Sequence, residues 1–240
     1  MSGIHEKEQS IGRITSGIER ENALAIRTID FVSQQLPAWR DDPDRHQEEA
    51  EDRLNLQLCK FLDSRARNEF PMVRFDHEEY QTGRHRVDLS ASPVESTTIG
   101  VKLHTVYDPI LVFECKRLPA PTADREKEYV TGGEDLKSGG LQRFKLGLHG
   151  ANLSIAAMVG YVQGQSSCYW HERINRWISE LVSGAAKDTC EWSSGEVLGP
   201  LEEYASKGIS RCRSIHSRGR QARGKEILIY HLWVAMTTRN

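Results

Sequence analysis

The run Ile-Leu-Val-Phe-Glu-Cys at residues 110–115 constrains the fold more than any other segment of this 240-residue chain. Its continuous apolar, β-branched and aromatic composition is typical of a strand that is buried on both faces of a sheet. Residues 153–162 and 226–236 have a similar texture and predict two more buried strands, although the alanine and methionine residues of the first also allow a helix. Such strands need helices on both faces of their sheet, so we predict an α/β (α+β) fold with a mixed central β-sheet flanked by helices.

Two amphipathic segments precede these strands. Apolar side chains recur at helical spacing over 10–36, and we expect this helix to end at Pro37, which has no N–H group to donate. A second helix is predicted over about 46–67, after an acidic link. Together the two predict an N-terminal helical hairpin. We therefore divide the chain into an N-terminal helical segment (1–44) and one larger domain (45–240).

The rest of the chain is predicted to alternate strands with helices. Strand-like residues after Pro71 and at 85–92 lead to the buried run, which predicts a three-stranded meander. Helices are predicted within 141–148 and over 171–182, where apolar side chains again recur at helical spacing. Between the second of these helices and the last strand we expect a long basic connection.

Charged side chains occur where two predicted strands leave the core. Residues two apart in a strand point to the same face, so Glu114 and Lys116 share a face while Cys115 points into packing on the other. Asp88 lies between apolar neighbours in the strand-like segment Arg-Val-Asp-Leu-Ser. Adjacent strands would bring the two carboxylates together, and close carboxylates repel unless a cation lies between them. The alternative is a structural cluster of salt bridges at the end of the sheet.

An all-oxygen site of this kind suits Mg²⁺ or Mn²⁺, and the backbone carbonyl of Cys115 is a natural further ligand. Lys116 would then lie near the metal-bound water, where it orients or helps to deprotonate the nucleophile, or offsets charge in the transition state. Glu114-x-Lys116 is the only Glu-x-Lys sequence in the chain. The competing Asp135-x-Lys137 lies in a polar, glycine-rich segment with no predicted strand to hold it.

These residues resemble a known group of enzymes. Arg-Val-Asp88, followed later by Phe-Glu114-Cys-Lys116, is similar to the motif of the PD-(D/E)XK nuclease superfamily, with Val87 in place of the proline of the name. The resemblance covers about 46–165 and implies a restriction-endonuclease-like mixed sheet and dependence on Mg²⁺. It further implies endo- or exonuclease hydrolysis of DNA phosphodiester bonds in anti-phage defence, restriction or repair.

The resemblance also implies further site residues. Members commonly carry a catalytic or metal-ligating acid on the helix before the meander, and Glu51 matches it, with Glu48 as the alternative. Gln142 matches the glutamine-bearing helix that some members set behind the active site, and Arg143 would contact a phosphate. The competing interpretations are solvated acids on a helix face and an ordinary polar helix start.

Residues 205–225 contain seven basic side chains and no acid. Such a stripe suits a nucleic-acid backbone, although a solvated loop explains it equally well. The segments around His216 and His231 resemble the closing segment of several defence-associated members, which implies that these histidines contact the substrate; the alternative for His231, beside Trp233, is a satisfied core residue. The arginines for which we predict nucleic-acid contacts are Arg211, Arg213, Arg218, Arg220 and Arg223.

Several features bear on location and partners. No apolar run approaches the roughly 18 residues that span a bilayer, and the N-terminus lacks the apolar core of a secretory signal, so we expect a cytoplasmic protein without a membrane partner. No GxxxxGK[ST] loop is present, so ATP-driven movement on DNA would need a partner ATPase or helicase. The N-terminal helices are compatible with a homodimer. Two other functions stay open: an RNA-directed nuclease, and a catalytically inactive nuclease-fold subunit that binds nucleic acid or assembles within a larger defence complex.

Overall fold

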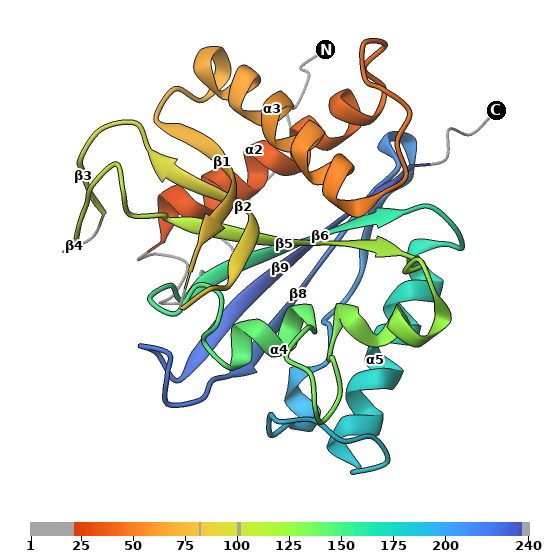
Figure 1. Ribbon diagram of the computed structural model, residues 1–240. Coiled ribbons are helices and arrows are strands. Elements are labelled where there is room, and N and C mark those ends of the chain that lie inside the picture. The colour runs from red at the N-terminus through yellow and green to blue at the C-terminus, as the bar shows by residue number, and fades with distance from the viewer. Residues whose placement is uncertain (1–21, 82, 100–101, 237–240) are drawn as a thin grey trace, which may run out of the picture.

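The computed structural model describes residues 22–81, 83–99 and 102–236, which form a seven-stranded mixed sheet (Figure 1). In spatial order the strands of the sheet are β1 (Val73–Tyr80), β2 (Arg86–Pro93), β5 (Leu111–Leu118), β6 (Ile155–Val162), β9 (Glu226–Ala235), β8 (Ile209–Ser217) and β7 (Glu202–Tyr204). The strands are antiparallel from β1 to β5, parallel from β5 through β6 to β9, and antiparallel again from β9 to β7. A separate hairpin of β3 (Thr97–Ile99) and β4 (Lys102–His104) follows β2 in the sequence and precedes β5.

Helices cover both faces of this sheet, which confirms the predicted mixed sheet flanked by helices. The first pair and the second pair lie on opposite sides of the strands in Figure 1, and each contributes to its own buried apolar cluster. The first pair is α2 (Ala23–Arg40) and α3 (Glu51–Glu69), and the second is α4 (Gly140–Lys145) and α5 (Ser167–Val182). Short 3-10 turns in the connections are η1 (Ala123–Tyr129), η2 (Ser194–Glu196) and η3 (Ala205–Lys207).

The first helix does not end at Pro37, so that prediction is wrong. The helix continues to Arg40, although proline removes one of its hydrogen bonds. The last turn is held by Trp39, which is buried and packs on the ring of Tyr161 at 5.6 Å. Residues 10–21 of the predicted helix lie outside the described residues, and the proposed division of the chain after residue 44 stays a prediction.

The basic connection predicted over 205–225 contains a strand, which is a second correction. β8 pairs antiparallel with β9 from Ile209↔Val234 to Ser217↔Glu226. The sequence gives no apolar alternation here because the buried face of β8 is built mostly from small or polar side chains. These buried residues are Ser210, Cys212, Ser214 and His216. Hydrogen bonds along that face replace much of the apolar packing that usually identifies a strand.

Candidate active site

The predicted acids meet where β2 and β5 separate. The pairing of the two strands ends at Leu89↔Phe113, although both strands continue beyond that pair. Asp88 and Glu114 occupy the next position on each strand. The carboxylate of Asp88 enters the opening, and its Oδ2 accepts the main-chain N–H of Cys115 at 2.6 Å. A side chain therefore takes the place of the next hydrogen bond of the ladder.

Lys116 places its ammonium group between two carboxylates. Its Nζ lies 2.9 Å from Oε1 of Glu114 and 3.2 Å from Oε1 of Glu51, the first residue of α3. The other oxygen of Glu51 accepts the main-chain N–H of Arg117 at 3.0 Å, which ties the helix to β5 at a second point. Of the two helix acids that the resemblance allowed, Glu51 reaches the site. Glu48 precedes α3, which begins later than the sequence predicted.

Glu114 is 0% exposed and contacts three nitrogen-bearing side chains. Its Oε1 pairs with Lys116 and, at 2.7 Å, with Nη1 of Arg143. Its Oε2 lies 3.0 Å from Nδ1 of His149, which is also fully buried, although neither ring nitrogen of His149 makes a hydrogen bond of favourable angle. The sequence analysis assigned no role to His149. Arg143, for which we predicted a phosphate contact, binds the carboxylate of Glu114 and keeps part of its side chain exposed.

Burial and neighbouring charges together set the charge states of Asp88, Glu114 and Lys116. Burial raises the pKa of Asp88 to about 8, with Glu114 adding to the rise and Lys116 opposing it. Burial also raises the pKa of Glu114, but its cationic neighbours, Lys116 first, bring it below the ordinary value. Burial lowers the pKa of Lys116, but the carboxylates of Glu114 and Glu51 raise it above the ordinary value. Glu114 and Lys116 thus form an ionised pair, while Asp88 resists ionisation.

A hard divalent cation fits the oxygen atoms at this opening. The raised pKa of Asp88 marks a place where added positive charge is favourable. Asp88 and Glu114 would hold the ion together with the main-chain carbonyl of Cys115, whose side chain packs in the core. Within the described parts of the chain, no group of three or more His, Cys, Asp or Glu side chains is arranged as a metal site. Mg²⁺ is commonly held by only one or two carboxylates and keeps several waters.

Replacing Asp88 by asparagine is expected to stabilise the fold at alkaline pH. Because folding raises this pKa from 3.8 to about 8, the wild-type protein loses stability as the pH rises through that range, and asparagine removes the loss while keeping an oxygen for the N–H of Cys115. We expect a gain of about 2 to 4 kcal/mol in the free energy of unfolding at pH 8, and little at pH 4. Urea unfolding at the two pH values measures it. The control is Asp76→Asn, which changes an exposed ion pair with Arg74. A gain of equal size for Asp88→Asn at pH 4 and pH 8 would contradict the prediction.

The side-chain amide of Gln142 forms hydrogen bonds with the loop that precedes α4. The oxygen accepts the N–H groups of Gly132 at 3.1 Å and of Gly139 at 3.2 Å. The nitrogen donates to Asp188 and, at 3.3 Å, to Thr189. The side chain is fully buried among these partners. These contacts give Gln142 a structural role, and a catalytic role for it stays a prediction.

The arginines predicted to bind nucleic acid differ in exposure, and even the exposed Arg213 lies over the ring of Tyr230. Arg218 is a correction, because its guanidinium donates to four main-chain oxygens within 144–153 at 2.8 to 3.3 Å and is committed to these turns. Arg211 pairs with Asp30 of α2 at 2.9 Å. The exposed side chains, for which the prediction stays open, are Arg213, Arg220 and Arg223.

The two histidines considered as substrate contacts are a further correction. His216 and His231 are completely buried, and each ring bonds to the hydroxyl of Ser214. Neither ring can reach a substrate at the surface.

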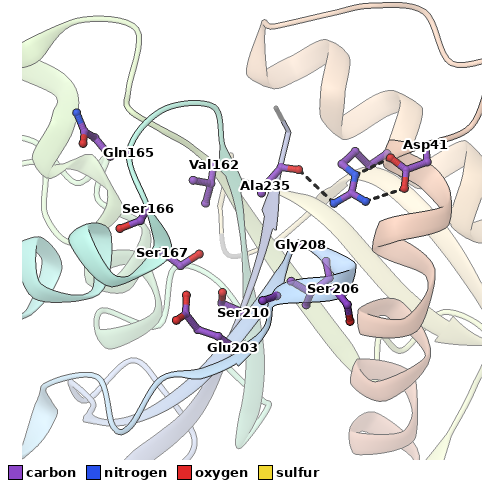
Figure 2. A pocket seen from close by; sticks show the side chains of 13 residues that line it. Asp41, Val162, Gln165, Ser166, Ser167, Glu203, Ser206, Gly208, Ser210 and Ala235 are labelled. Carbon is purple, nitrogen blue, oxygen red and sulfur yellow. Dashed lines mark hydrogen bonds and ion pairs between the residues drawn. The ribbon is translucent and has the colours of Figure 1, made fainter. Parts of the chain in front are cut away.

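A pocket with a volume of about 660 Å³ lies elsewhere, between the C-terminal end of α2, the N-terminal end of α5 and β8 (Figure 2). Arg40 is among the lining residues, and its guanidinium donates to Asp41 and to the main-chain oxygen of Ala235. Ser167 and Glu203 lie opposite. The acids and the lysine of the candidate site do not line this pocket, so it is a separate feature of the molecule.

No family model matches the chain, and no curated protein or solved structure matches it. Among the residues that the structure describes, no helix has both the length and the apolar character needed to cross a bilayer. Function has to be inferred from the residues and geometry of the site.

Proposed function

We propose that this chain is a metal-dependent nuclease of the PD-(D/E)XK type, with a restriction-endonuclease-like fold, that hydrolyses phosphodiester bonds of DNA in defence, restriction or repair. The observation that carries the proposal is the opening between β2 and β5, where Asp88, Glu114 and Lys116 meet. Two acids and a lysine from adjacent strands can hold a divalent ion and offset the charge of a phosphoryl group at one place. Glu51 supports the proposal because it adds a helix acid to the same group.

Each residue has a distinct task in this proposal. Mg²⁺ or Mn²⁺, bound by Asp88, Glu114 and the carbonyl of Cys115, would polarise the scissile phosphate and lower the pKa of a water molecule. Lys116 acts as a cation, because its raised pKa keeps the ammonium charged at neutral pH, and it offsets the negative charge that develops on the phosphoryl oxygens. This charge state favours stabilisation of the transition state over proton abstraction for Lys116. Glu51 orients the ammonium from the other side.

The purified protein is expected to cut plasmid and linear DNA in Mg²⁺ or Mn²⁺ and to stop when EDTA is added. Asp88→Asn should fold and be inactive, since it removes one of the two carboxylates. Asp76→Asn should cut at the wild-type rate, because that carboxylate belongs to an exposed ion pair. A matched RNA in the same assay distinguishes DNA from RNA as the substrate. Cleavage that persists in EDTA or in Asp88→Asn would contradict the proposal.

A second function is favoured by one observation. The carboxylate of Glu114 is already neutralised by Lys116 and Arg143. A nuclease-fold subunit that binds nucleic acid, or assembles with other defence proteins, without cutting would also be compatible with this pairing. Such a subunit would shift DNA in a gel in Mn²⁺ without cleaving it, and Asp88→Asn would bind with unchanged affinity. Running the gel shift beside the cleavage assay separates the two functions.

A further inference from the structure

A chain of buried hydrogen bonds crosses the core between η1, β9, β8 and η2. The hydroxyl of Tyr129 lies 2.7 Å from Nδ1 of His231, whose Nε2 lies 2.8 Å from Oγ of Ser214. The same Oγ lies 2.7 Å from Nε2 of His216, whose Nδ1 lies 3.1 Å from Oε2 of Glu196. All five side chains are between 0% and 4% exposed. Nothing in the proposed reaction uses them directly.

The carboxylate at the Glu196 end sets the direction of this hydrogen-bond chain, and the contact at the Trp233 end is compatible with that direction. The indole N–H of Trp233 can only donate, and it lies 2.9 Å from the hydroxyl oxygen of Tyr129. At the other end burial raises the pKa of Glu196, but hydrogen bonds, that from His216 first, lower it to about 2, so its carboxylate only accepts. Donation therefore runs one way along the chain. Burial lowers the pKa of both histidines, so each ring is neutral and carries one proton, on Nε2 in His231 and on Nδ1 in His216.

The hydrogen-bond chain is anchored at both ends of segment 129–145 of the polypeptide. Tyr129 is the first residue of this segment and belongs to the chain itself. Lys145 is its last residue, and its Nζ bonds to Glu196 and lies 3.2 Å from the main-chain oxygen of Ser217. One continuous set of buried hydrogen bonds thus fastens the beginning and the end of the segment to β8 and β9.

Segment 129–145 lies directly against the candidate active site. It contains α4, which carries Arg143, and Nη1 of Arg143 lies 2.7 Å from Oε1 of Glu114. A Cβ atom added at Gly140 would lie 3.4 Å from Cγ of Glu114, so the backbone of α4 itself approaches the catalytic carboxylate. A shift of this segment would therefore move the guanidinium of Arg143 relative to the carboxylate of Glu114.

We propose that the hydrogen-bond chain positions Arg143 on Glu114 and that Ser214 is the positioning residue that joins its two halves. The hydroxyl of Ser214 donates to His216 and accepts from His231, and it connects the anchor at Tyr129 with the anchor at Lys145. Removing it leaves two buried ring nitrogens without a partner and separates the anchors. The consequence for activity rests on the proposed nuclease function, whereas the protonation and anchoring do not.

Ser214→Ala and Ser210→Ala are a matched pair for testing this. Both serines lie on the buried face of β8 and are 4% exposed, but the hydroxyl of Ser210 has no part in the chain. Ser214→Ala is expected to lower kcat for DNA cleavage roughly 10-fold with little change in KM, since outer residues that orient a site commonly have effects of this size. Ser210→Ala should be unchanged, and Ser214→Thr, which keeps the hydroxyl, should restore most of the rate.

Two measurements test the chain without relying on cleavage. Imidazole ¹⁵N chemical shifts are expected to show a proton on Nε2 of His231 and on Nδ1 of His216, and the reverse assignment or a charged ring would overturn the chain. Amide hydrogen exchange in 140–145 should be faster in Ser214→Ala than in Ser210→Ala, and equal exchange would overturn the anchoring. If the wild-type protein cuts no DNA, the proposed function fails, but these two measurements still test the hydrogen-bond chain and its anchoring. If it cuts and the two alanine variants cut equally, the positioning role fails and the proposed function stands.

Discussion

Lys116→Met is expected to lower the rate of DNA cleavage by about 10²- to 10³-fold and to leave the protein folded. Methionine keeps the stem of the side chain but removes the ammonium group that lies 2.9 Å from Glu114. Because the raised pKa of Lys116 keeps that group charged, a full positive charge is lost from the site. Glu114 still has Arg143 as a partner, so its buried carboxylate is not left unpaired. We therefore expect activity to fall far more than stability.

Lys127→Met is the matched control for this variant. The ammonium of Lys127 pairs with Glu180 at 2.8 Å between exposed parts of the two side chains. Exposed ion pairs contribute little to stability, so this protein should fold and cut as the wild type does. Plasmid cleavage in Mg²⁺ measures both rates, with circular dichroism to confirm the fold. A Lys116→Met protein that cuts as fast as Lys127→Met would remove Lys116 from the mechanism.

The acids and the lysine could be predicted because short-range patterns place them. Strand periodicity puts Glu114 and Lys116 on one face, and the apolar run around them identifies a buried strand. A meander pairs neighbouring strands, which brings Asp88 beside Glu114. Glu51 was less certain, because its contact comes from a separate helix whose start was predicted too early. The sequence could name two helix acids and could not choose between them.

The rest of the site depends on contacts that no local pattern encodes. His149 lies in a turn among glycines, where neither helical nor strand periodicity shows which way its ring points, yet it reaches Oε2 of Glu114. Arg218 looks like a phosphate ligand by charge alone. In the folded chain the carbonyl groups of nearby turns need donors, and its guanidinium supplies them. The charge of a side chain shows which groups it can bind, but only the folded structure shows which of these groups lies next to it.

β8 illustrates the same limit for secondary structure. Its buried residues Ser214 and His216 carry little apolar surface, so the alternation that identifies a strand is missing. Ser214 bonds to His231 of β9, and His216 bonds to Glu196 in a distant turn of the chain. The strand is stabilised by polar contacts that exist only once these segments have packed. This polar interior also gathers buried charge beside α4, where a single substitution should have its largest effect on stability.

Lys145→Met is expected to destabilise the fold by about 3 to 5 kcal/mol at pH 7, because it breaks a buried ion pair and leaves one charge behind. The side chains of Lys145 and Glu196 are 2% and 4% exposed, and water cannot replace the lost ammonium group. Urea unfolding measures the loss. Lys187→Met is the control, since Lys187 and its partner Glu134 are both exposed and their nitrogen and oxygen lie 3.6 Å apart. Equal stability of the two variants would contradict the prediction.

The pH dependence of this loss and a double variant test its cause. Burial raises the pKa of Glu196, but its hydrogen bonds lower it from 4.5 to about 2, so the stability that this carboxylate contributes is present above about pH 4.5 and is lost as the pH falls through 2. The difference between the wild type and Lys145→Met should therefore shrink as the pH falls below about 4. Adding Glu196→Gln to Lys145→Met removes the stranded charge and keeps an oxygen for the N–H of His216, so the double variant should be more stable than the single one. A double variant no more stable than Lys145→Met would mean that lost packing, and not unpaired charge, destabilises the fold.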